Sequence, residues 1–191
     1  MRTKEQNGQL ASLLFPEVKE TPEEILKRYP KRDTEGMVLR FAPSPTGFMH
    51  IGNVYTGLVC TKLAGQTEGV SILRIEDTDK EREIENGVTQ IVNGLKGFGI
   101  EFGEGMVNET EGKGEYGPYI QSERLDIYKV FAKDLVSKGY AYPCFMKEEE
   151  LEEMRKKQEE LKVATGCYGK WAKWRDAEVK NIKKKLESGE E

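Results

Sequence analysis

The pattern of apolar and polar positions predicts a strand and a helix joined by a rigid loop. Met37, Val38 and Leu39 form a short apolar run typical of a buried strand. The loop at 40–50 is stiffened by Pro43 and Pro45. Apolar residues then recur at helical spacing, namely Ile51, Val54, Tyr55, Leu58, Val59 and Leu63. This order places the unpaired N–H groups of a helix beside any phosphate bound there.

A second strand is predicted at 70–75, after a turn that Gly65 and Gly69 bracket. A strand, a helix and a strand in succession indicate a right-handed crossover and parallel pairing. An amphipathic helix is expected at 81–96. We therefore expect an α/β fold with a Rossmann-type parallel sheet.

The remaining segments complete the expected domain organisation. Residues 1–36 are predicted to be an N-terminal extension with a helix from Pro22 to about Tyr29. Residues 37–143 are predicted to form the first half of a nucleotide-binding domain, and 144–191 the beginning of an inserted subdomain. Within them we expect a loop at 99–120, a strand at 139–145, a charged helix at 147–161 and a fraying helical tail from 176. Ser122 is expected to cap a helix whose buried stripe comprises Leu125, Tyr128, Ala132, Leu135 and Val136.

Composition excludes few classes of protein. Of the 191 residues, 37% are hydrophobic and 34% are charged, which suits a modest core with solvated helices. Since no apolar run is long enough for a membrane span or a signal peptide, we expect a cytoplasmic protein without membrane contact. A net charge of −4 argues against non-specific nucleic-acid binding by the whole chain, but it permits a local basic face.

Charged residues end both predicted strands. Arg40 offers a planar fork for a carboxylate, and Glu76 can hold an ammonium group. Because ligands bind beyond the carboxyl ends of parallel strands, the two residues are expected to face one crevice. The alternative for 76–79 is an acidic turn that caps the next helix. His50, the single histidine, can stabilise charge on a phosphoryl group or can merely cap its helix.

Two stretches carry a resemblance to a known family. His50-Ile51-Gly52-Asn53 resembles the first signature of class I aminoacyl-tRNA synthetases, with Asn53 in place of the usual second histidine. The flanking Arg-Phe-Ala-Pro-Ser-Pro-Thr-Gly at 40–47, and Leu-Arg-Ile-Glu-Asp-Thr-Asp at 73–79, resemble bacterial-type glutamyl-tRNA synthetases.

The resemblance implies a reaction and a set of site residues. Glutamate and ATP would give glutamyl-adenylate and pyrophosphate, with Mg²⁺ accompanying ATP, and the acyl group would then move to tRNA(Glu). The implied catalytic residues are His50, Gly52 and Asn53, with Gly52 leaving room for adenine. Glutamate binding falls to Arg40, Ala42, Ser44 and Glu76, and ATP binding to Thr46, His50 and Gly52. The inserted subdomain would contact the tRNA acceptor end, and a monomer is expected.

Zinc is not expected, although some relatives hold it near this insertion. This chain has Cys144-Phe145-Met146 in place of a Cys-x-Cys pair, and only Cys167 remains nearby as a ligand. No other metal site is predicted. The aromatic and basic residues at 166–175 are open to two interpretations, base stacking with phosphate neutralisation or core packing with a basic rim.

Three alternatives to a glutamyl-tRNA synthetase are open. A glutaminyl enzyme would carry glutamate in place of Ser44 and aspartate in place of Glu76. A tRNA-modifying paralogue that activates glutamate would share both motifs. A non-catalytic binding module would keep only the ligand contacts. Since no Lys-Met-Ser-Lys-Ser type loop is present, we expect an N-terminal piece that is incomplete for catalysis alone.

Overall fold

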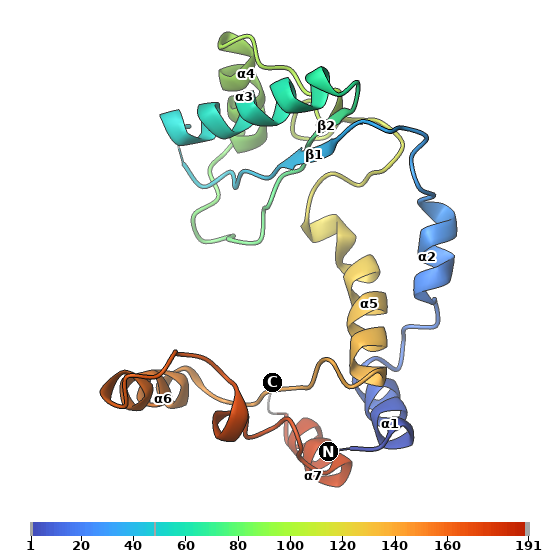
Figure 1. Ribbon diagram of the computed structural model, residues 1–191, viewed down its shortest axis with the longest axis vertical. Coiled ribbons are helices and arrows are strands. Elements are labelled where there is room, and N and C mark those ends of the chain that lie inside the picture. Colours follow the sequence, from blue (N-terminus) through green and yellow to red (C-terminus); the bar gives the residue numbers. More distant parts are fainter. Residues whose placement is uncertain (1, 48, 190–191) are drawn as a thin grey trace. The chain divides into compact units, whose positions relative to one another are not determined.

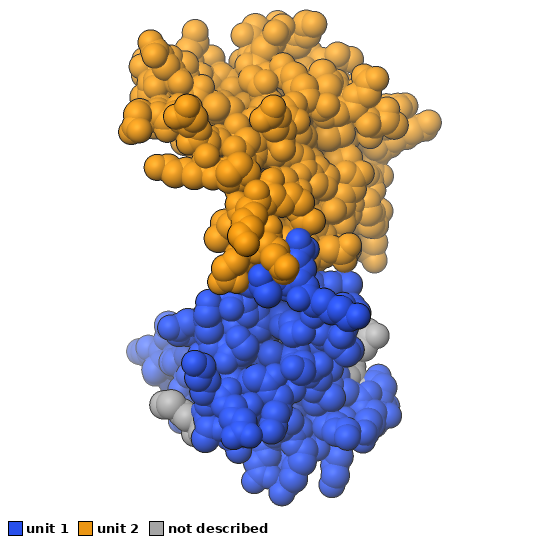
Figure 2. Space-filling model, turned by 90° about the vertical axis from the view of Figure 1, so that its right-hand side faces the viewer, with its two compact units in different colours: residues 1–22, 128–191 blue, residues 23–127 orange. Residues whose placement is uncertain are grey.

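The computed structural model describes residues 2–47 and 49–189 (Figure 1). Phe48, which belongs to the signature stretch, lies outside the described residues, as do residues 1, 190 and 191. The chain divides into two compact units, coloured in Figure 2: unit 1 comprises 1–22 and 128–191, and unit 2 comprises 23–127. The sequence-based boundaries at 36 and 143 stay a prediction.

Unit 2 contains the sheet. Its elements in order are most of α2 (Pro22–Arg28), β1 (Val38–Phe41), α3 (Ile51–Gln66), β2 (Val70–Leu73), α4 (Gly87–Gly97), β3 (Glu104–Met106), β4 (Gly112–Lys113), the 3₁₀ turn η1 (Ser122–Arg124) and the first residues of α5 (Leu125–Ser137). Unit 1 holds α1 (Lys4–Leu14), the rest of α5, α6 (Glu148–Glu160), the 3₁₀ turn η2 (Gly169–Trp171) and α7 (Val179–Glu187).

The four strands lie in the order β1-β2-β3-β4. Strands β1, β2 and β3 are parallel, with Val38 opposite Val70 and Phe41 opposite Leu73, whereas β4 runs antiparallel to β3. Helices α3 and α4 connect successive parallel strands and lie on the same side of them (Figure 1). The predicted α/β fold with parallel pairing is therefore confirmed, and the carboxyl ends of β1 and β2 share one edge.

Helix α3 forms where predicted, but its buried side consists of small residues. Gly57, Cys60 and Ala64 face the core, while Ile51, Tyr55, Leu58, Val59 and Leu63 are 36–79% exposed. A Cβ at Gly57 would meet Leu95 Cδ2 at 3.0 Å, so the small residues allow α3 to lie close to α4. Strand β1 is also less buried than predicted, since Val38 is 45% exposed.

Several element boundaries differ from the sequence-based prediction in unit 2. Helix α4 begins at Gly87 rather than near 81, because Asn86 adopts a left-handed conformation with φ of 55°. The predicted loop at 99–120 contains β3 and β4. These strands are only 3 and 2 residues long and carry glycine or charge, so they show no apolar alternation.

The strand predicted at 139–145 is absent from the described chain. Gly139, with φ of 79°, ends α5 instead. The N–H groups of Tyr140 and Ala141 donate to the carbonyl of Leu135, so this backbone closes the helix rather than joining a sheet. The buried stripe of α5 is also shifted: Ile127, Val130 and Val136 are buried, whereas Leu125 and Leu135 are exposed.

Unit 1 has a core of its own. It is built from Leu10, Ala11, Val136, Phe145 and Ile182, of which Leu10 and Ile182 are completely buried. The predicted helices at 22–29 and 147–161 are confirmed as α2 and α6. The tail does not fray as predicted, because α7 buries Ile182 against this core. None of the helices formed by the described residues is both long and apolar enough to span a membrane.

Candidate functional site

The strand ends of β1 and β2 bring Arg40 and Glu76 into contact. The Nη1 of Arg40 donates to Oε1 of Glu76 at 2.9 Å, and Arg74 Nη2 lies 3.8 Å from the same oxygen. The side chains of Arg40 and Glu76 are 39% and 36% exposed. The sequence predicted that these two residues would face one crevice, and the geometry shows them paired at one sheet edge.

The loop after β1 is held by backbone hydrogen bonds from two other segments, one after β2 and one before α4. The Glu76 N–H donates to the Pro43 carbonyl at 2.9 Å, and the Ile84 N–H donates to the Pro45 carbonyl at 3.0 Å. Pro45 is fully buried, whereas Ser44 on the same loop is exposed. Of the other candidates on this loop, Ala42 and Thr46 are half-buried. The loop is therefore fixed by the backbone and presents Ser44 to solvent.

His50 is the N-cap of α3. Its Nδ1 accepts the Gly52 N–H at 3.2 Å, and its carbonyl accepts the Asn53 N–H at 2.9 Å. The side-chain oxygen of Asn53 is buried and has no hydrogen-bond partner among the described residues. The hydrogen bonds and ion pairs seen in the described chain do not join His50 to the Arg40–Glu76 pair.

Asp77 holds the acidic turn at 76–79 in place through hydrogen bonds. It is buried, and its carboxylate accepts the Ser122 N–H at 2.9 Å, the Ser122 hydroxyl at 2.5 Å and Lys80 Nζ at 2.9 Å. Burial raises the pKa of Asp77, but the hydrogen bonds from Ser122 and Lys80 outweigh it and hold that pKa below its ordinary value. The prediction that Ser122 caps α5 is wrong, because Ser122 begins the 3₁₀ turn η1 that precedes α5, and its hydroxyl donates to Asp77.

A second buried network lies at β3, and sequence reasoning missed it. Glu104 is 5% exposed and accepts from Arg32 Nη2 at 2.6 Å and from the Tyr119 hydroxyl at 2.5 Å. Arg32 also lies 3.6 Å from the centre of the Tyr116 ring. Burial and the bond to Glu104 raise the pKa of Tyr119 to about 12. The sequence pattern does not indicate this network. Arg32 is 72 residues from Glu104, and Tyr116 and Tyr119 lie in a segment without periodicity.

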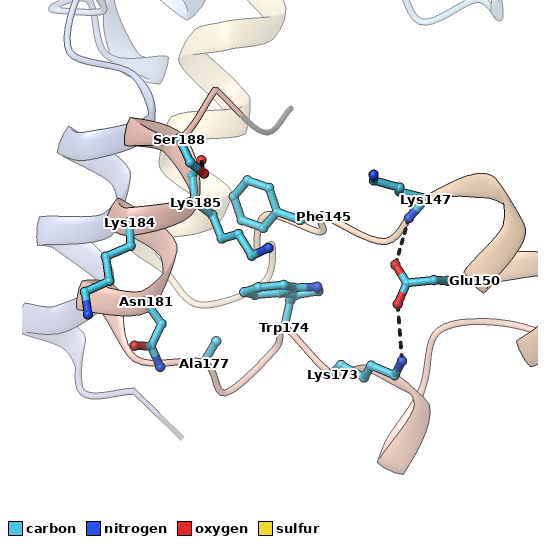
Figure 3. A pocket seen from close by; sticks show the side chains of 10 residues that line it. All are labelled: Phe145, Lys147, Glu150, Lys173, Trp174, Ala177, Asn181, Lys184, Lys185 and Ser188. Atoms are coloured by element: carbon cyan, nitrogen blue, oxygen red, sulfur yellow. Dashed lines mark hydrogen bonds and ion pairs between the residues drawn. The ribbon is translucent and has the colours of Figure 1, made fainter.

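Unit 1 carries a hollow of about 950 Å³ lined by lysines (Figure 3). Its cationic residues are Lys147, Lys173, Lys184 and Lys185, and Glu150 is the carboxylate among its lining residues. Trp174 and Phe145 pack edge to face with ring centres 4.9 Å apart. For the segment at 166–175, the structure favours core packing by Trp174, with basic residues at the rim.

The cysteines lie in unlike environments. Cys60 is buried, and burial raises the pKa of its thiol, whereas Cys144 is exposed and Cys167 is half-buried. Among residues 2–47 and 49–189, no three His, Cys, Asp or Glu side chains gather as a metal site would require. The expectation that zinc does not bind stays a prediction.

Comparison with known proteins identifies the family. The chain is 50% identical over 183 residues to a glutamate–tRNA ligase of Clostridium perfringens (strain 13 / Type A), a match that covers 95% of this chain and 34% of the relative. A glutamate–tRNA ligase of Bacillus subtilis (strain 168) is 50% identical over 120 residues, or 63% of this chain and 24% of the relative. The chain therefore spans about a third or less of the length of these curated relatives.

A solved structure agrees with these sequences. The crystal structure of a glutamate tRNA ligase from Elizabethkingia meningosepticum CCUG26117 in complex with its amino acid matches with a TM-score of 0.66 and 34% identity, over 82% of this chain and 31% of that one. The family model described as "tRNA synthetases class I (E and Q), catalytic domain" matches residues 36–190. The parallel sheet, the signature at the start of α3 and these matches together show that the chain belongs to the class I glutamate and glutamine tRNA synthetase catalytic-domain family.

Proposed function

We propose that this chain forms the glutamate- and ATP-binding part of a glutamate–tRNA ligase. The observation that carries this proposal is the contact between Arg40 and Glu76 at the ends of two adjacent parallel strands. Ligands of open parallel sheets bind at such an edge. An amino acid substrate carries both a carboxylate and an ammonium group, so an arginine and a glutamate there complement it.

Glutamate would bind by exchanging partners with this ion pair. An ion pair between exposed side chains contributes only about 0–1 kcal/mol, so its opening costs little. Arg40 would then hold the side-chain carboxylate of the substrate and Glu76 its ammonium group, each through a charge-assisted bond of about 1.5–3 kcal/mol. Ala42 and Ser44, on the rigid loop, would line the same site.

ATP would bind at the start of α3. The first N–H groups of this helix point towards any phosphate placed there, and the helix dipole favours its negative charge. His50, Gly52 and Thr46 belong to this part of the chain. Mg²⁺ enters this proposal with ATP, as part of the substrate.

The tRNA acceptor end would contact unit 1. The lysine-lined hollow supports this part of the proposal, because phosphate contacts supply most of the affinity for nucleic acids. The hollow supplies positive charge locally although the whole chain is acidic, with a net charge of −4. The expected monomeric state and cytoplasmic location stay predictions.

A titration of the ¹⁵N-labelled chain with glutamate, followed by NMR, tests the amino acid site. We expect glutamate to shift the amide signals of 40–46 and 74–77. Glutamine lacks the second carboxylate and aspartate is shorter, so both should cause smaller shifts at equal concentration. Equal responses to all three compounds, or signals that move only in unit 1, would contradict the proposal.

A further inference from the structure

We propose that Gly52 is the positioning residue of His50, because its missing side chain lets the imidazole rest on the start of α3. The inference concerns how the ring is held. It rests on the proposed function only for the identity of the phosphate that the ring would meet.

The hydrogen bond between the two residues holds the Nδ1 edge of the ring. The Gly52 N–H donates to Nδ1 of His50 at 3.2 Å, which is the N-cap contact of α3. Since Nδ1 is the acceptor, the hydrogen of a neutral ring belongs on Nε2. The cap therefore leaves Nε2–H as the ring donor available to a ligand.

The space beside Gly52 explains why glycine stands there. A Cβ built on Gly52 would lie 3.0 Å from Cε1 and 3.1 Å from Nδ1 of His50; apart from the adjoining residues and the backbone of α3 itself, the described chain places no other atom within 4 Å of it. Carbon atoms in good contact are about 3.5–4.0 Å apart, so a side chain here would force the ring to shift by a few tenths of an ångström and lengthen its cap bond.

A second glycine of the same helix shows the contrast. Gly65, near the other end of α3, has no atom within 4 Å of a built Cβ. Glycine is a poor helix former, so an alanine at either position should favour the helix. At Gly52, but not at Gly65, the gain in helix stability from alanine is offset by the displacement of the His50 ring from its cap position.

The single histidine makes the arrangement directly measurable. In the full chain labelled with ¹⁵N-histidine, at alkaline pH, we expect one set of ring signals with Nε2 protonated and Nδ1 bare. G52A should move these signals towards a mixture of tautomers, and the amide at position 52 should exchange with solvent roughly fivefold faster, the factor that corresponds to a typical N-cap. G65A should change neither readout.

Removal of the ring supplies the second test. In an H50N background asparagine can still cap the helix but presents no ring, so G52A and G65A should there raise the thermal midpoint alike. The proposal is overturned if G52A leaves the ring signals and the position 52 amide unchanged, or if H50N/G52A is impaired like G52A. Should G52A not fold, a folded H50N/G52A supports the proposal and an unfolded one overturns it. Neither glutamate nor ATP is present, so failure of the proposed function leaves these readouts intact.

Discussion

The carboxylate of Glu76 accepts a hydrogen bond from Arg40 at 2.9 Å, although the two residues are 36 positions apart in the sequence. Parallel pairing of β1 with β2 produces this contact, since Arg40 is opposite Ile72 and Glu76 follows the end of β2. The two groups proposed to hold the substrate thus hold one another in its absence. Because the pair is exposed, opening it for a substrate costs little.

Substitution of Arg40 should separate binding from stability. We expect Arg40→Gln to change the free energy of unfolding by less than about 1 kcal/mol, as is usual for exposed ion pairs. Glutamate affinity should fall by about 10-fold or more, since one charge-assisted bond is lost. Urea unfolding and a glutamate titration measure the two effects. Lys157→Gln, which opens an exposed pair with Glu153 on α6 in unit 1, is the control and should leave glutamate affinity unchanged.

Exchange of the two charges between positions 40 and 76 tests whether their order matters for binding. The double variant R40E/E76R keeps one positive and one negative group at the sheet edge, so its unfolding free energy should stay close to that of the unaltered chain. The charges would then face the wrong ends of glutamate, and binding should be lost. Retained binding by this double variant would show that the pair is structural.

Acid should weaken unit 2 through Glu104. Burial raises the pKa of Glu104, but hydrogen bonds from Arg32 and Tyr119 more than compensate and hold it below its ordinary value of about 4.3. Because the folded pKa is the lower one, the stabilisation is complete above about pH 4.3 and is lost as the pH falls through the folded pKa.

Removal of the Glu104 charge should abolish part of this dependence. We expect Glu104→Gln to cost about 2 kcal/mol at pH 7, in the range of hydrogen bonds to charged groups. Its unfolding free energy should also decline less between pH 5 and pH 3 than that of the unaltered chain. Glu101→Gln, an exposed neighbour on the same segment, is the control and should reproduce the original pH profile. Identical profiles for both variants would exclude Glu104 as the source.

The sequence predicts those parts of the fold that local chemistry decides. Residues 38–41 and 70–73 are apolar enough to indicate strands, and the motifs at their ends carry Arg40 and Glu76, which the structure brings into contact. Helix caps formed by residues close in the chain can also be predicted from the sequence. The position of His50 directly before α3 indicates such a cap, and its Nδ1 accepts the N–H of Gly52, two residues on.

Packing between distant segments decides the rest. Strand β3 is a strand because it pairs with β2, and its buried Glu104 is satisfied by Arg32, 72 residues away. Apolar spacing on α3 identifies a helix but not its buried side, since Gly57, Cys60 and Ala64 are chosen by how closely α4 approaches. Which strands pair and which side of a helix is buried depend on two segments together. The pattern within one segment does not determine them.

The exposed side of α3 leads to a prediction about stability. Leu58 is 40% exposed, whereas Leu95 on α4 is 1% exposed within the core. Leu95→Ala should therefore cost about 2–5 kcal/mol, and Leu58→Ala less than about 1 kcal/mol. The two variants carry the same chemical change on helices of one unit, so urea unfolding compares burial alone. Similar losses for both would mean that this face of α3 is covered in solution.

The lysine-lined hollow should reveal itself through salt dependence. Each phosphate that a protein neutralises releases condensed counterions, about 0.7–0.9 per phosphate for nucleic acids that range from single strands to duplex DNA, and an RNA acceptor-stem hairpin should behave similarly. If Lys173 and Lys184 each contact one phosphate, the double variant K173Q/K184Q should reduce the slope of log K against log salt by roughly 1–2. The weakening should be uniform across hairpin sequences, because phosphates carry no sequence information. Fluorescence anisotropy at several salt concentrations measures both the slope and the affinity.

The control is Lys4→Gln, because Lys4 is an exposed lysine of unit 1 outside the hollow. This variant should leave the slope unchanged. An equal drop in slope would assign binding to overall charge rather than to the hollow.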